Sequence, residues 1–196
     1  MKSWVTLLLL AAVTAPLAAD ARASKRDADV LKQKVATIQA QADRPAKQGL
    51  RTTVTQNEVN AYLVYEAPQQ LPAGVVEPAV TILGTGRLSG RAVVDLDAVR
   101  RAKATQSWFD PTNYLTGRLP VVATGTLTTT KGVGRFALES ASVGGVPVPK
   151  VLLQEIVTYY SRTAENPSGI NLDDPFALPA RIREIQVERG QAIIVQ

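Results

Sequence analysis

The chain has 196 residues, a formal net charge of +5, and hydrophobic residues at 45% of its positions. This length fits one domain, and the hydrophobic fraction is enough for a core, which argues against wholesale disorder. The chain contains neither cysteine nor histidine. Disulfides, Cys/His zinc sites, thiol nucleophiles and every triad with an imidazole base are therefore excluded. We expect a non-enzymatic protein without a metal or a cofactor.

Residues 1–23 have the pattern of a secretory signal peptide. Lys2 is followed by an apolar run over residues 4–19, and small residues allow cleavage near Ala21 or Ala23. A retained membrane anchor is the alternative, but the run is shorter than the ~20 apolar residues that a span needs, and a threonine and a proline interrupt it. We therefore expect an exported, periplasmic protein.

The positive charge favours either weak attraction to a membrane surface or solubility alone. Arg100, Arg101 and Lys103 stand near Trp108 and Phe109, a combination that could make transient contact with a membrane. The alternative is an ordinary charged loop. No dense basic run alternates with aromatic residues, so nucleic acid is not an expected partner. The oligomeric state stays open.

The mature chain begins with an expected helix over Ser24–Gln41, inside an N-terminal helical segment of residues 24–48. Its apolar residues recur at helical spacing. After a β-prone run over residues 50–54, Thr55 and Glu58 form a capping-box pattern that predicts a second helix, which ends at Pro68.

The hydrophobic period then changes to two, which predicts strands. "LPAG" is a turn, "KGVG" is a hairpin turn, and Arg189–Gly190 turns a final hairpin. Pro78 places the first of these strands at a sheet edge or near a bulge. Tight hairpins join antiparallel strands, so the predicted class is α+β. Besides the final hairpin, the expected strands are residues 75–83, 86–96, 121–129 and 133–143.

The stretch Gly145–Arg162, "GVPVPKVLLQEIVTYYSR", predicts a late helix with aliphatic residues around much of its circumference. Such a helix should be buried on most sides, and a strongly curved sheet rolled around it is the economical solution. The alternative is an ordinary core helix on a sheet. Tyr159 and Tyr160 suit the rim between an apolar cavity and water, because buried phenol hydroxyls need partners.

Several phrases in this order resemble a known family: "TVTQNEVNAYL", "LPAGV", "GRLSGRAVVDLDAV", the late apolar helix, and the closing "PFALPARIREIQVERGQAIIV". Together they are similar to the small bacterial, periplasmic branch of the tubular lipid-binding (TULIP) superfamily. The resemblance covers residues 50–196 and implies a lipid-binding domain over 49–196. It further implies a curved antiparallel sheet wrapped around a long C-terminal helix, with a tunnel for acyl chains between them. The chain departs from lipoprotein members because it lacks an anchoring cysteine and adds the helix over 24–41.

The resulting hypothesis is a lipid-binding protein that holds acyl chains in an apolar groove between helix and sheet. A structural or interaction module of the cell envelope with a filled core is the alternative, and an envelope hydrolase is a third possibility. Asp95 and Asp97 are expected on one face of a strand, where they could form a two-carboxylate site or be merely solvated. The residues expected to line the groove are Leu152, Leu153, Ile156, Val157 and Tyr160 of the helix, with Val94 and Leu96 of the sheet.

Overall fold

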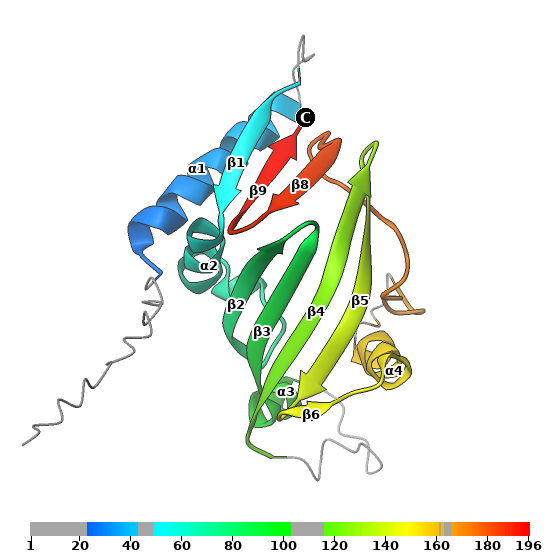
Figure 1. The fold of residues 1–196 in the computed structure, drawn as a ribbon. Helices are drawn as coiled ribbons and strands as arrows, with labels where there is room; N and C mark the ends of the chain where they lie inside the picture. Colours follow the sequence, from blue (N-terminus) through cyan, green and yellow to red (C-terminus); the bar gives the residue numbers. More distant parts are fainter. Residues whose placement is uncertain (1–22, 43–48, 103–115, 161, 163–165) are drawn as a thin grey trace, which may run out of the picture.

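A computed structural model describes residues 23–42, 49–102, 116–160, 162 and 166–196, without the side chains of 102, 159 and 160. The order of elements agrees with the predicted order of helix, strand, helix, four strands, helix and two strands (Figure 1). A 3-10 turn, a short third helix and two short strands are additional. The helices are α1 (Lys25–Ala42), α2 (Gln56–Tyr65), α3 (Leu96–Ala102) and α4 (Lys150–Tyr160), with the 3-10 turn η1 (Pro68–Gln70). The strands are β1 (Arg51–Thr55), β2 (Val75–Gly84), β3 (Arg87–Asp95), β4 (Arg118–Thr130), β5 (Val133–Val143), β6 (Val146–Pro147), β7 (Phe176–Ala177), β8 (Glu184–Glu188) and β9 (Gln191–Val195).

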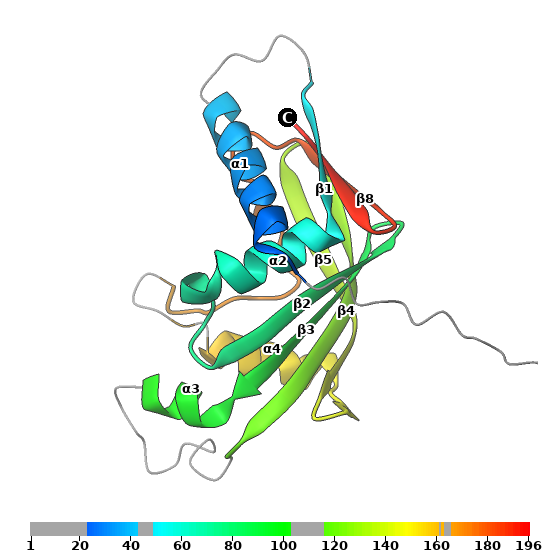
Figure 2. The same ribbon diagram turned by 90° about the vertical axis from the view of Figure 1, so that its left-hand side faces the viewer.

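Helix α1 confirms the predicted N-terminal helix to within one residue at each end. The Ser24 hydroxyl accepts a hydrogen bond from the Asp27 backbone N–H at 3.1 Å, which caps the first turn. Leu31 and Ile38 are buried along one face, and Figure 2 shows this helix crossing α2 on one side of the sheets. At its far end the Gln196 side chain donates to the Ile38 carbonyl oxygen at 2.9 Å. The last residue of the described chain is therefore tied to α1.

Helix α2 begins with the capping box that the sequence predicts. The Thr55 hydroxyl accepts from the Glu58 backbone N–H, and the Glu58 carboxylate accepts from the Thr55 N–H at 2.9 Å. The buried Glu58 carboxylate also accepts from Lys34 Nζ at 2.7 Å. One acidic side chain therefore caps α2 and ties it to α1.

The strands form two antiparallel sheets, whereas the sequence predicted one curved sheet. The three-stranded sheet has the order β1-β9-β8, and the six-stranded sheet has the order β2-β3-β4-β5-β6, with β7 paired to β5. Hydrogen bonds from Gly190 N–H to the Ile82 oxygen (2.9 Å) and from Ile185 N–H to Thr129 Oγ1 (2.8 Å) join the two sheets. The expected edge position of Pro78 is confirmed, because β2 is an edge strand whose register shifts between Val76 and Ala79.

The fold is α+β with antiparallel sheets, as predicted, but the six-stranded sheet does not close, and the chain ends in strands. Figure 1 places α1 and α2 on the side of β1 and β2, and α4 beside β5 at the opposite edge. Within the described residues, no helix has the length and hydropathy that a membrane span requires. The predicted signal peptide over 1–23 lies outside the described residues apart from Ala23.

Candidate functional site

The six-stranded sheet separates its side chains by polarity because its strands alternate with a period of two. Leu88, Gly90, Ala92 and Val94 of β3 point to one face, while Arg87, Ser89, Arg91, Val93 and Asp95, which are mostly polar, point to the other. In β4 the in-register partners on the first face are Gly125, Ala123, Val121 and Leu119. In β5 the same face continues with Phe136, Leu138 and Ala141. We call this surface the apolar face.

The apolar face is incompletely covered. Its buried apolar side chains are Ala141 and Ile82, the latter from β2, where it lies opposite Leu88. Leu88, Val94, Phe136 and Leu138 stay half-buried. Among the described residues no large side chain is completely buried. A Cβ atom placed on Gly90, near the middle of the face, meets no atom within 4 Å. The side chains of this surface therefore do not fill the space above it.

Helix α4 lies beside β5 and is not wrapped by the sheet, so the prediction that it is buried on most sides was wrong. Val151 is 73% exposed, Leu152 49% and Ile156 40%. Leu153 and Val157, each one residue further along, are half-buried on the adjacent face of the helix. The physical reason lies in the topology: the helix has only 11 residues, and the strand before it, β6, has two, so no sheet reaches around it. The side chain of Tyr160 lies outside the described residues.

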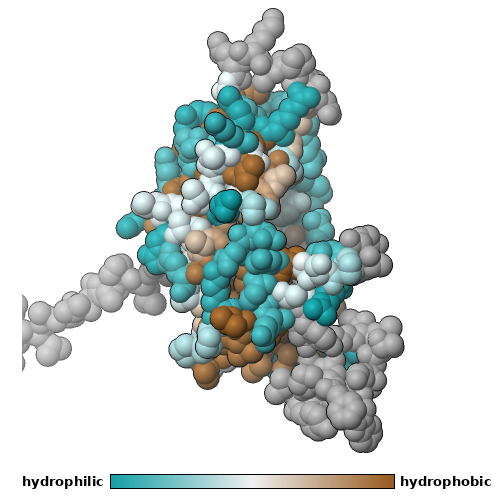
Figure 3. Space-filling model, turned by 90° about the vertical axis from the view of Figure 1, so that its right-hand side faces the viewer, coloured by the Kyte–Doolittle hydropathy of each residue, from teal (hydrophilic) through white to brown (hydrophobic). Residues whose placement is uncertain are grey.

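Apolar side chains remain on the surface of this part of the molecule. Figure 3 faces the side that carries α4 and shows hydrophobic residues gathered on its lower part. Val146, just before α4, is 66% exposed, and Ile170 and Phe176, after it, are 52% and 44% exposed. Large apolar residues that gather on one exposed face often mark a binding site.

Residues 166–176, which follow α4, form a segment with two turns that was not predicted from the sequence to be functional. The Gln154 side chain fixes it to α4, because its amide donates to the Ile170 carbonyl oxygen at 3.0 Å and accepts from the Leu172 N–H at 2.8 Å. Lys150 and Asp173 form an ion pair at 2.5 Å. Helix α4 and the 166–176 segment are thus held together by side chains of the helix.

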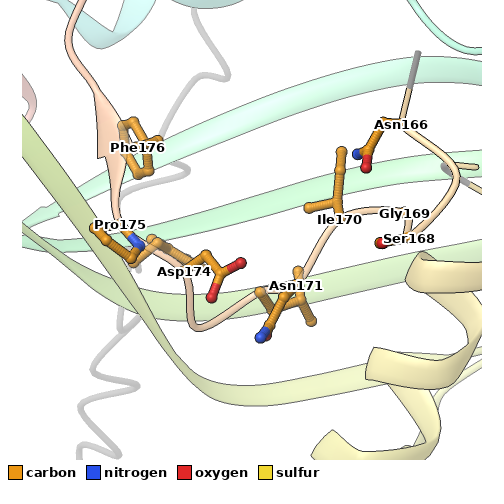
Figure 4. A pocket seen from close by; sticks show the side chains of 10 residues that line it. Asn166, Ser168, Gly169, Ile170, Asn171, Asp174, Pro175 and Phe176 are labelled. Atoms are coloured by element: carbon orange, nitrogen blue, oxygen red, sulfur yellow. The ribbon is translucent and has the colours of Figure 1, made fainter.

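An open pocket of about 530 Å³ lies between the 166–176 segment and β5 (Figure 4), and we call it the β5 pocket. Phe136 brings the apolar face to this pocket, so the two are continuous. The Phe176 ring lies over Gly134 of β5, where an added Cβ would approach the ring to 2.6 Å. The ten described lining residues are Phe136, Asn166, Ser168, Gly169, Ile170, Asn171, Leu172, Asp174, Pro175 and Phe176.

Of the two sheet residues predicted for the site, Val94 lies in β3 and Leu96 lies just beyond the end of that strand. Val94 lies on the apolar face, paired with Leu119. Leu96 is the first residue of α3, so its prediction as a strand position was wrong. The strand ends because the Asp95 carboxylate accepts from the Ala98 N–H at 2.8 Å, which caps the helix.

Asp95 and Asp97 do not form the two-carboxylate site that their spacing allowed. The cap from the Ala98 N–H, with the charge of Arg118, holds the pKa of Asp95 below its ordinary value. Asp97 lies in α3 and pairs with Arg100 at 2.5 Å. Within the described part of the chain, no cluster of three or more acidic residues is placed to hold a metal ion. Arg100 and Arg101 lie in α3, whereas Trp108 and Phe109 lie outside the described residues.

The comparisons with known proteins do not identify a family for this chain. No family model and no curated protein matches the chain. Among solved structures, the chain is similar to the crystal structure of a lipopolysaccharide binding protein, with 16% sequence identity and a TM-score of 0.23. The match covers 75% of this chain and 40% of that protein. A similarity this distant does not show a shared function, and the resemblance to the tubular lipid-binding superfamily stays a prediction.

Proposed function

We propose that this protein is a non-enzymatic lipid-binding protein that holds acyl chains against the apolar face, beside α4. The observation that carries the proposal is the uncovered state of that face, with the open space above Gly90. An aliphatic surface without cover is unfavourable in water, and an acyl chain laid on it removes apolar area from both partners.

Burial of acyl carbons supplies the free energy of binding, at ~0.8 kcal/mol per methylene. In this proposal Val94 belongs to the floor of the site, and Leu152, Leu153, Ile156, Val157 and Tyr160 of α4 lie along its β5 side. Leu96 lies at the end of β3, where the floor stops. The exposed aliphatic residues of α4 become covered when the ligand is present.

The proposal places the protein in the periplasm, after cleavage of the signal peptide, as a member of the small bacterial tubular lipid-binding branch. The predicted domain over 49–196 includes both sheets, and the predicted segment over 24–48 includes α1. The support for this part comes from the sequence: the signal-peptide pattern and the quoted phrases.

The substitution Gly90→Leu tests the function directly, because a leucine there occupies the space that the ligand needs. Ala137→Leu is the matched control, since Ala137 is exposed on the opposite face of the sheet. Protein purified from cells is analysed by native mass spectrometry and its lipids by organic extraction. We expect co-purified lipid in the wild type and the control, and a strong loss in Gly90→Leu at unchanged stability. Absence of lipid from the wild type, or full retention by Gly90→Leu, would contradict the proposal.

A further inference from the structure

The β5 pocket differs from the apolar face in its mixture of groups. Two phenyl rings, Phe136 and Phe176, line it together with hydroxyl, amide and carboxylate groups. A site for the hydrocarbon part of a ligand needs only apolar residues, so these polar groups at the edge of the apolar face indicate contact with the polar part of the same ligand.

The described lining residues give the pocket a negative charge. Its ten described lining residues include no lysine or arginine, and Asp174 is the acidic residue among them. The Asp174 carboxylate forms no hydrogen bond or ion pair with a described residue, whereas Lys150 neutralises the neighbouring Asp173 at 2.5 Å. Figure 4 shows Asp174 extending into the space between Phe176 and Ile170. An anionic headgroup would meet repulsion here.

An ammonium group fits this arrangement. A carboxylate attracts it by charge and accepts its hydrogen bonds, and phenyl faces attract cations through the ring quadrupole. The Ser168 hydroxyl is a further lining group that accepts hydrogen bonds. We propose that the β5 pocket binds the ammonium-bearing headgroup of a zwitterionic phospholipid whose acyl chains lie on the apolar face. This inference rests on the proposed function.

Competition between lipids tests the inference. Delipidated protein is incubated with vesicles containing equal parts of phosphatidylethanolamine, phosphatidylglycerol and a neutral glycosyldiacylglycerol with the same acyl chains. The bound lipid is then extracted and quantified by mass spectrometry. Because the Asp174 carboxylate that would pair with the ammonium group is exposed, we expect only about two- to fivefold enrichment of phosphatidylethanolamine over each competitor. Asp174→Asn should bring that ratio close to one, while Asp29→Asn, which removes the same charge from an exposed position on α1, should leave it unchanged.

The outcomes separate the two proposals. Bound lipid with the composition of the vesicles, a preference for either competitor, or an unchanged ratio in Asp174→Asn overturns the headgroup assignment and leaves lipid binding intact. Absence of bound lipid from the wild type overturns the proposed function itself. The last measurement compares the affinity of soluble glycerophosphoethanolamine with that of the intact lipid. If it binds as tightly as the intact lipid, the pocket recognises a free amine, and the lipid assignment is overturned.

Discussion

The side chain of Asn60 pairs with the backbone of Val80 as a neighbouring strand would. Asn60 Nδ2 donates to the Val80 carbonyl oxygen at 3.0 Å, and Asn60 Oδ1 accepts from the Val80 N–H at 2.7 Å. Gln56, one turn earlier, accepts from the Ile82 N–H at 2.8 Å. Helix α2 thereby covers the open edge of β2, where unpaired backbone groups would otherwise invite association with another chain.

Asn60→Ala should lower the free energy of unfolding by about 1–3 kcal/mol, because it leaves two backbone groups of Val80 without their partner. The exposed edge should also increase aggregation during refolding. Asn57→Ala is the control, since Asn57 is exposed on the same helix. Urea denaturation measures both variants, and equal losses would show that the amide pairing contributes nothing specific.

Truncation of two isoleucines should lower the stability of the fold by different amounts. Ile38 is 5% exposed, so Ile38→Ala should cost about 2–4 kcal/mol of stability through lost burial and a cavity. Ile156 is 40% exposed, so Ile156→Ala should cost less than about 1 kcal/mol. Under the proposed function, the second variant should nevertheless take up less lipid. Thermal unfolding and lipid extraction test the pair, and a large destabilisation by Ile156→Ala would indicate a buried α4.

Gly74 and Gly90 differ in what an added methyl group meets. Gly74 has a φ of +83°, and its Cβ would approach the Asp95 carbonyl oxygen to 2.6 Å. Gly74→Ala should therefore cost at least about 2 kcal/mol. Gly90→Ala meets open space in a strand and should stabilise the fold by about 0.4–1 kcal/mol, because it restricts the unfolded chain. Denaturation midpoints check the order, and loss of stability in Gly90→Ala would mean that the space above it is filled.

Asp95 should contribute to the acid sensitivity of the fold. Because the Ala98 N–H and the charge of Arg118 lower its pKa below the ordinary value of 3.8, the folded state favours the charged form. The resulting stabilisation is fully present above the ordinary pKa of the unfolded chain, and it is lost as the pH falls through the lowered pKa of the folded state. Asn can still cap α3 but does not titrate. The stability difference between the wild type and Asp95→Asn should therefore shrink between pH 7 and pH 3.

Asp29→Asn serves as the control for the acid prediction, because Asp29 is exposed on α1 and accepts no hydrogen bond from a described residue. Its stability should follow the wild type across the same range. Parallel curves for the wild type and Asp95→Asn would show that the cap does not depend on the charge.

Local chemistry made much of the fold predictable from the sequence. The capping box of Thr55 and Glu58 fixed the start of α2, and Lys131 and Gly132, both with positive φ, form the two-residue turn expected between β4 and β5. The bulge beside Pro78 follows from the missing backbone donor. Each of these features depends on residues within a few positions of one another.

The surroundings of α4 were not predictable in the same way. Its aliphatic periodicity is the same whether a sheet encloses the helix or leaves it exposed, and only the pairing of the strands decides between these cases. The 166–176 segment has no period, and its attachment through Gln154 depends on the folded position of α4. The β5 pocket therefore arises from contacts that no short stretch of sequence encodes.

The pairing of β1 with β9 has a consequence for how the molecule folds. Arg51 lies opposite Val195, and Thr55 opposite Gln191, so most of the chain separates the two partners. Contacts between such remote positions slow folding, because the entropy of closing the long loop is lost before any pairing compensates it. A nascent chain cannot complete its three-stranded sheet until its last strand has been synthesised, and during that interval its apolar strands need protection from premature association.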